Sequence, residues 1–252
     1  LWPAGRGNVG YGANAGSNHT SRMPDQELRL GEGFFIGLGV SVKFPADYSR
    51  SPYSILATGM TTLPQKVCFP FSLISPPDHR PREVPDGYNR ISPGWILTDN
   101  LYSLARNCWK YGNRATVVHT PVNPAFPGND VVEMTRDALE RLRNHPAGDM
   151  PGVGRNFLTE DDRRRGITAY ETMLEAVDLY RGYRESGLSA AAALRFRELL
   201  DMAEERVVAS RMKDYSRGPG IIEDYGRVRG APEEDAFLRD FRRRLHDLKS
   251  SL

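Results

Sequence analysis

Hydrophobic positions in the first third of the chain recur at intervals of six residues. Val9 and Ala15 are six residues apart, as are Ile36 and Val42, and glycine follows both Val9 and Ile36. After a slip of one residue, the same interval continues through Ile55, Thr61, Val67 and Leu73. A six-residue period of aliphatic, glycine and small residues indicates short strands joined by tight corners, with each aliphatic side chain pointing into a narrow interior.

This pattern resembles the hexapeptide repeat of left-handed β-helix proteins, in which three units of six residues close one coil. We therefore predict a β-solenoid plus α fold, in which the C-terminal coils of a left-handed parallel β-helix precede a mainly α-helical domain. The alternative is a glycine-rich loop region followed by an antiparallel sheet. The predicted domains are the β-helix (1–75), a proline-rich connector (76–97) and the helical domain (98–252).

The pattern changes to helical spacing after residue 98. Apolar side chains recur three and four residues apart in each segment, which is typical of amphipathic helices. Thr159 and Asp162 have the spacing of an N-terminal capping box, and Gly187 suits the end of the helix that follows. The predicted helices cover residues 98–111, 130–143, 159–187, 189–207 and 232–248.

The distribution of charge supports a boundary between the two parts. Residues 1–77 contain 10 Asp, Glu, Lys and Arg, whereas residues 78–252 contain 56. Five prolines fall within residues 76–94, where they disfavour regular secondary structure. The formal net charge is only +2, which argues against nucleic acid as a partner.

The sequence also limits the cellular context. The apolar runs are too short for a transmembrane helix and no signal peptide is visible, so we expect a cytoplasmic protein with no membrane partner. The chain begins at Leu1 with the glycine pattern already under way by Gly5, so we expect it to be the C-terminal part of a longer protein. Cys68 and Cys108 lie among apolar residues, and we expect buried thiols.

Several blocks of sequence resemble a family of uncharacterised bacterial proteins found in Bacteroidetes and spirochaetes. That family combines a left-handed β-helix with a C-terminal helical segment and has no assigned reaction. More distantly, the repeat is similar to that of hexapeptide acyltransferases and of sugar nucleotidyltransferases with a β-helical tail. The blocks are GANAGSNHTSR (12–22), GEGFFIGLGVSVKFP (31–45), SPYSILATG (51–59), FPFSLI (69–74) and LYSLARNCWKY (101–111).

One histidine does not fit the repeat. If Ala15 begins a unit, His19 occupies a position that normally holds a small or β-branched residue. The distance from Ala15 to Ile36 is 21 residues where one coil needs 18, so we expect a loop at about residues 22–30 to project beside His19. The alternative is structural: Asn14 and Asn18 form a polar ladder, and His19 hydrogen-bonds a loop carbonyl.

The resemblance to hexapeptide acyltransferases implies a role for this histidine as the general base, because its pKa lies near the working pH. The resemblance implies a transferase acting on an activated sugar or small metabolite, by acyl or nucleotidyl transfer, with acyl-CoA or a nucleotide sugar as the donor. No metal site is expected. The predicted substrate-binding residues are Asn14, Asn18, Arg22, Lys43 and Asp25.

The second hypothesis is a non-catalytic assembly or scaffold module. Prisms of this kind commonly pack three abreast, and the helical stripes provide apolar faces for neighbouring subunits. We therefore expect a homo-oligomer, for example a trimer. Catalysis and assembly remain compatible, because acyltransferase sites often lie between subunits.

Overall fold

A computed structural model describes residues 7–16, 27–114, 126–214 and 231–252. The chain divides into two compact units, each built from two stretches of sequence. The β unit comprises Leu1–Leu97 and Pro127–Glu171, and the α unit comprises Thr98–Phe126 and Thr172–Leu252.

The β unit contains every strand found in the described ranges, and each of these strands is two to four residues long. The strands are β1 (Asn8–Val9), β2 (Asn14–Gly16), β3 (Leu28–Leu30), β4 (Phe35–Ile36), β5 (Ser41–Lys43), β6 (Ala46–Tyr48), β7 (Ile55–Leu56), β8 (Thr61–Thr62), β9 (Gln65–Lys66), β10 (Leu73–Ser75), β11 (Asn89–Ser92) and β12 (Asn156–Phe157).

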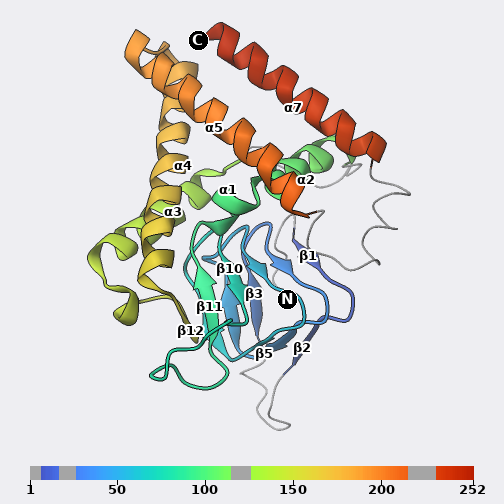
Figure 1. Cartoon of the computed structure of the whole chain (residues 1–252), viewed down its shortest axis with the longest axis vertical. Coiled ribbons are helices and arrows are strands. Elements are labelled where there is room, and N and C mark those ends of the chain that lie inside the picture. Colours follow the sequence, from blue (N-terminus) through green and yellow to red (C-terminus); the bar gives the residue numbers. More distant parts are fainter. Residues whose placement is uncertain (1–6, 17–26, 115–125, 215–230) are drawn as a thin grey trace. The chain divides into compact units, whose positions relative to one another are not determined.

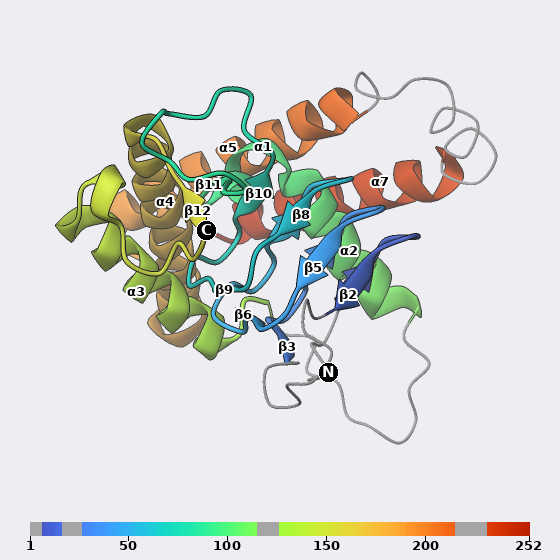
Figure 2. The ribbon, with the colours of Figure 1, turned by 90° about the horizontal axis from the view of Figure 1, so that it is seen from below.

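These strands form three sheets, which Figures 1 and 2 show from two directions. One sheet has six strands in the order β1-β4-β7-β10-β11-β12, and the other two have the orders β2-β5-β8 and β3-β6-β9. Every pair is parallel except β10–β11, which is antiparallel. Consecutive strands from β1 to β9 therefore enter the three sheets in turn.

The described part of the chain includes six α-helices and a short 3-10 helix. The α unit contains α2, α5 and α7, which pack around Tyr102, Val207 and Phe237. The helices are α1 (Trp95–Asp99), α2 (Leu101–Arg114), α3 (Asn129–Asn144), η2 (Ala147–Asp149), α4 (Glu160–Ser186), α5 (Ala190–Asp214) and α7 (Ala231–Ser251).

The predicted fold class, β-solenoid plus α, is wrong. The structure is an α/β fold with mixed sheets of short, mostly parallel strands and helices. The six-residue period ends after β10, because the chain returns through β11 in the opposite direction. The sheet is then extended by β12, which lies more than sixty residues further along the chain, and α3 belongs to the same unit as the strands.

The predicted inward-facing set is partly correct and contains one error of register. Ile36, Val42 and Val67 are buried. Leu56 and Ile74, rather than the predicted Ile55 and Leu73, are aligned with Ile36 and fully buried. Because side chains alternate between the two faces of a strand, a shift of one residue exchanges the buried and outward positions. Val9 and Ala15, on strands β1 and β2, are exposed.

The predicted projecting loop is also corrected where the structure describes it. Ala15 of β2 pairs with Val42 of β5, 27 residues later, whereas Ile36 lies on β4 in a different sheet. The 21 residues from Ala15 to Ile36 are therefore not the length of one repeat. Residues 22–26 lie outside the described residues. Residues Leu28–Leu30 form strand β3 instead of projecting, and Leu28 is buried.

Candidate functional site

The predicted histidine cluster is only partly described. His19, Asn18, Arg22 and Asp25 lie outside the described residues. Asn14 lies on β2, where its side-chain oxygen accepts a hydrogen bond from the Ser41 hydroxyl of β5 at 3.1 Å. Lys43 follows Ser41 by two residues and therefore lies on the same face of the sheet.

A shallow groove on the β unit gathers a different set of side chains, which we call the cationic groove. Arg50 follows strand β6, Lys66 lies on β9, and Cys68 comes two residues after Lys66. Helix α3 and the loop before β12 form the rest of the wall. The lining residues are Arg50, Lys66, Cys68, Asp137, Arg141, Gly152 and Gly154.

The backbone fixes the relation between the strand and the loop that form this groove. The N–H of Cys68 donates to the carbonyl of Gly152 at 2.8 Å. Helix α3 provides Asp137 and Arg141, which are four residues apart and therefore lie on one face of the helix. The N–H of His145 caps the end of this helix by donating to the Arg141 carbonyl at 3.1 Å.

Cations outnumber anions in the groove by three to one. Asp137 accepts a hydrogen bond from Arg50, which neutralises one positive charge. Lys66 lies 3.8 Å from a carboxylate oxygen of Asp47, at the edge of the ion-pair range. The guanidinium of Arg141 has no hydrogen bond or ion pair with any residue that the structure describes. The groove therefore offers positive charge to a ligand.

Two glycines keep the groove open. A Cβ atom at Gly152 would lie 2.9 Å from Nη1 of Arg141 and 3.2 Å from Cβ of Cys68. A Cβ atom at Gly154 would lie 2.8 Å from Oε1 of Gln65. Both residues have positive φ, of 87° and 70°, which also favours glycine. A larger residue at either position would strain the loop and crowd the wall of the groove.

A neighbouring groove shares Lys66, and we call it the ladder groove. Arg29, Asp47 and Lys66 are aligned in register on the parallel strands β3, β6 and β9. Burial alone would raise the pKa of Asp47. Hydrogen bonds from Ser49, together with Lys66 and Arg29, outweigh that effect and lower the pKa. The full lining is Glu27, Arg29, Pro45, Ala46, Asp47, Pro64, Gln65, Lys66 and Arg155.

A buried glutamine positions the loop that forms one side of both grooves. The side-chain amide of Gln65 donates to the Tyr48 hydroxyl at 2.8 Å. Its carbonyl oxygen accepts from the Arg155 backbone N–H at 3.0 Å and from the Asn156 side chain at 2.7 Å. The beginning of β12 is thus attached to the interior of the β unit through one side chain.

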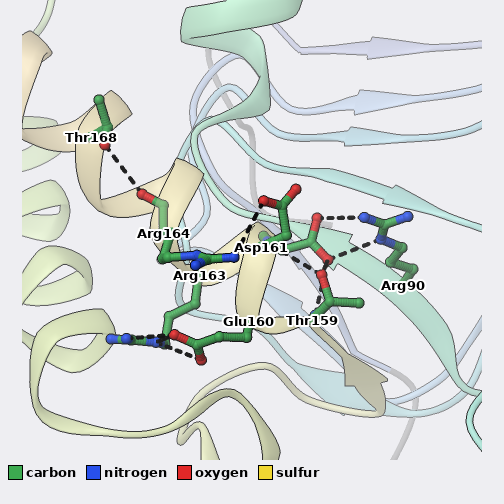
Figure 3. A network of polar contacts seen from close by, with 8 residues as sticks. Arg90, Thr159, Glu160, Asp161, Arg163, Arg164 and Thr168 are labelled. Atoms are coloured by element: carbon green, nitrogen blue, oxygen red, sulfur yellow. Dashed lines mark hydrogen bonds and ion pairs between the residues drawn. The ribbon is translucent and has the colours of Figure 1, made fainter.

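Contacts at the start of α4 hold the chain just after β12, and Figure 3 shows them. Thr159 and Asp162 form the predicted capping box: the Thr159 N–H donates to Asp162, and the Asp162 N–H donates to the Thr159 hydroxyl. Arg90, on β11, donates two hydrogen bonds to the Asp162 carboxylate, at 2.9 and 3.0 Å. The capping box is confirmed, and the sequence did not indicate its link to Arg90.

A third groove has the opposite charge. Among its lining residues are Glu83, Asp149 and His145, together with apolar side chains such as Met150 and Phe157. Among the described residues, no group of three or more His, Cys, Asp and Glu side chains is placed to hold a metal ion. Nor does any helix in the described ranges have the length and apolar character needed to cross a membrane.

The sequence did not predict the cationic groove. Arg50, Lys66 and Arg141 come from distant positions in the chain and belong to no recognisable motif. The sequence held only a local indication: in the loop sequence PGVGRN (151–156), Gly152 and Gly154 lie three residues and one residue before Arg155. Cys68 and Cys108 were both expected to be buried thiols; Cys68 is buried, whereas Cys108 is partly exposed.

Comparisons with known proteins give little functional information. The chain is similar to an uncharacterised protein of Treponema pallidum (strain Nichols), with 27% identity over 162 residues. The match covers 63% of this chain and 21% of that protein, so the chain spans about a fifth of the length of this relative. No family model matches the chain, and no solved structure matches it.

Proposed function

We propose that the protein binds a small anionic metabolite, with a phosphate or carboxylate group, in the cationic groove. The main supporting observation is the Arg141 guanidinium, which faces the groove without a partner among the described residues. An arginine can donate two parallel hydrogen bonds to a phosphate or carboxylate. Lys66 adds a second positive charge, because its contact with Asp47 is long.

The expected effect of removing this guanidinium is a loss of anion affinity. Hydrogen bonds between charged groups contribute roughly 1.5–3 kcal/mol, so the Arg141→Ala variant should bind about 10-fold or more weakly. Isothermal titration calorimetry with glucose 6-phosphate at low ionic strength would measure this difference. Binding by the wild-type protein should also weaken as salt is added.

A matched control lies on the same helix. Arg143 forms an exposed ion pair with Glu171 and does not line the groove. The Arg143→Ala variant should therefore bind the sugar phosphate as well as the wild-type protein does. Equal affinity in the Arg141→Ala and wild-type proteins would contradict the proposed site, as would equal losses in both variants.

Transfer of an acyl or nucleotidyl group, with His19 as the base, remains a second candidate. It is supported by the Asn14–Ser41 hydrogen bond and by Lys43 on the same face, which make a polar surface across β2 and β5. Both expected donors, acyl-CoA and nucleotide sugars, contain phosphate groups. An anion-binding groove is therefore compatible with such a reaction.

The test of this second candidate is the His19→Ala variant. If His19 is the general base, turnover of a nucleotide sugar or acyl-CoA donor should fall by about 100-fold or more, because general-base catalysis contributes roughly 10²–10⁴ in rate. The thermal unfolding midpoint should be unchanged. Full activity in the variant would end this hypothesis and leave the cationic groove unaffected.

A further inference from the structure

The cationic groove and the ladder groove meet at Lys66, which lines both. The side chain of Lys66 is well exposed and lies on β9. Arg141 lines only the cationic groove of the two, and Arg155 lines only the ladder groove. Lys66 is thus a cation shared by two grooves, each of which contributes an arginine of its own.

The two arginines are attached at opposite ends of the same short stretch of chain. Nε of Arg155 donates to the carbonyl of Pro64 at 3.0 Å. Nη1 of Arg141 lies beside Gly152, whose carbonyl accepts the N–H of Cys68 at 2.8 Å. One arginine is therefore held next to residue 64 and the other next to residue 68.

The backbone positions nearest the three cations have a spacing that follows from the extended chain on and beside β9. Residues 64, 66 and 68 are two apart, and an extended chain rises about 3.3 Å per residue. The positions are therefore separated by roughly 6–7 Å each and by about 13 Å end to end.

The neighbouring carboxylates are already engaged. Glu27 pairs with Arg29 at 2.7 Å, and Asp137 pairs with Arg50. Asp47 accepts hydrogen bonds from both the N–H and the hydroxyl of Ser49, at 3.0 and 2.6 Å. By contrast, the terminal nitrogens of Arg155 donate no hydrogen bond to any residue in the described ranges.

We propose that the ligand of this surface has two phosphate groups separated by a short linker, as in a sugar bisphosphate. This inference rests on the proposed function of the cationic groove. One phosphate lies between Arg141 and Lys66, and the other lies between Lys66 and Arg155. A ligand with a single phosphate uses only the first of these positions.

The test compares three probes on the full chain by isothermal titration calorimetry: fructose 1,6-bisphosphate, glucose 6-phosphate and inorganic pyrophosphate. We expect the bisphosphate to bind at least about tenfold more tightly than the monophosphate. In the Arg155→Ala variant this advantage should disappear, whereas the affinity for glucose 6-phosphate should stay the same. In the Arg141→Ala variant both affinities should fall. A thermal unfolding curve for each variant checks that the fold is intact.

The possible failures are distinguishable. If both sugar phosphates bind equally and Arg155→Ala changes neither affinity, the two-phosphate inference is wrong while the cationic groove remains an anion site. If pyrophosphate binds more tightly than the bisphosphate, the proposed spacing is wrong. If none of the probes binds, the proposed function fails together with this inference. The Arg164→Ala variant, which lies on α4 outside both grooves, is the control for a general loss of positive charge.

Discussion

Replacement of Ile36 by arginine is expected to unfold the β unit. Ile36 lies on β4, the second strand of the six-stranded sheet, between Val9 of β1 and Leu56 of β7 in register, and only 3% of its surface is exposed. An arginine there would bury a charge without a partner, in an interior that includes fully buried residues such as Leu56 and Ile74. We expect a loss of about 4 kcal/mol or more in the free energy of unfolding, measured by urea denaturation.

The matched control is Ala15→Arg. Ala15 lies on β2, whose one neighbour among the described strands is β5, and it is exposed even though its partner Val42 is buried. The new side chain can reach solvent, so the change in stability should be about 0.5 kcal/mol or less. If Ile36→Arg and Ala15→Arg had the same small effect, the interior would not be organised as described.

Replacement of Asp162 by asparagine is expected to destabilise the β unit by about 3 kcal/mol. Asparagine keeps an oxygen for the Thr159 cap but removes the charge that faces Arg90. The Asp162 side chain is 2% exposed, so little solvent compensates for the lost ion pair. Chemical denaturation of the single variants Asp162→Asn and Arg90→Gln and of the double variant would isolate the energy of the pair.

The same carboxylate predicts a dependence of stability on pH. Burial by itself would raise the pKa of Asp162, but hydrogen bonds from Arg90, Thr159 and Ser92 outweigh it and lower the pKa in the folded protein. The stabilisation is therefore complete above the unfolded-state pKa of about 4 and is lost as the pH falls through the lower folded-state pKa. The Asp162→Asn variant should lack this part of the acid destabilisation.

An adjacent residue distinguishes this effect from a general loss of negative charge. Asp161 is exposed and lies 3.9 Å from Arg164. Surface pairs of this kind contribute little, so Asp161→Asn should change stability by about 0.5 kcal/mol or less. Comparable losses in the two variants would show that the buried ion pair with Arg90 has no special role.

The sequence predicted local features of the fold better than its class. The boundaries of α3 and α4 and the start of α5 follow from apolar spacing and from the Thr159 cap, which are properties of nearby residues, whereas α5 ends seven residues later than predicted. The six-residue interval located the short strands at Ile36 and Val42. It did not show the reversal at β11 or the addition of β12, because these pairings join residues far apart in the chain.

The register error has a similar cause. Ile55 and Leu56 are both apolar and adjacent, so hydrophobicity alone does not tell which one points inward. The pairing of Leu56 with both Ile36 and Ile74 decides the question, and only the folded structure contains that pairing. The cationic groove was missed for the same reason: Lys66 and Arg141 are 75 positions apart and meet only through tertiary packing.

Gln65 has a consequence for how related sequences can diverge. Its amide joins Tyr48 in the interior to the backbone of Arg155 and the side chain of Asn156. A shorter or apolar residue at position 65 would remove three of the hydrogen bonds that hold this loop and would leave the buried Tyr48 hydroxyl without one of its partners. A change of the glutamine is therefore expected to be tolerated best when position 156 changes with it.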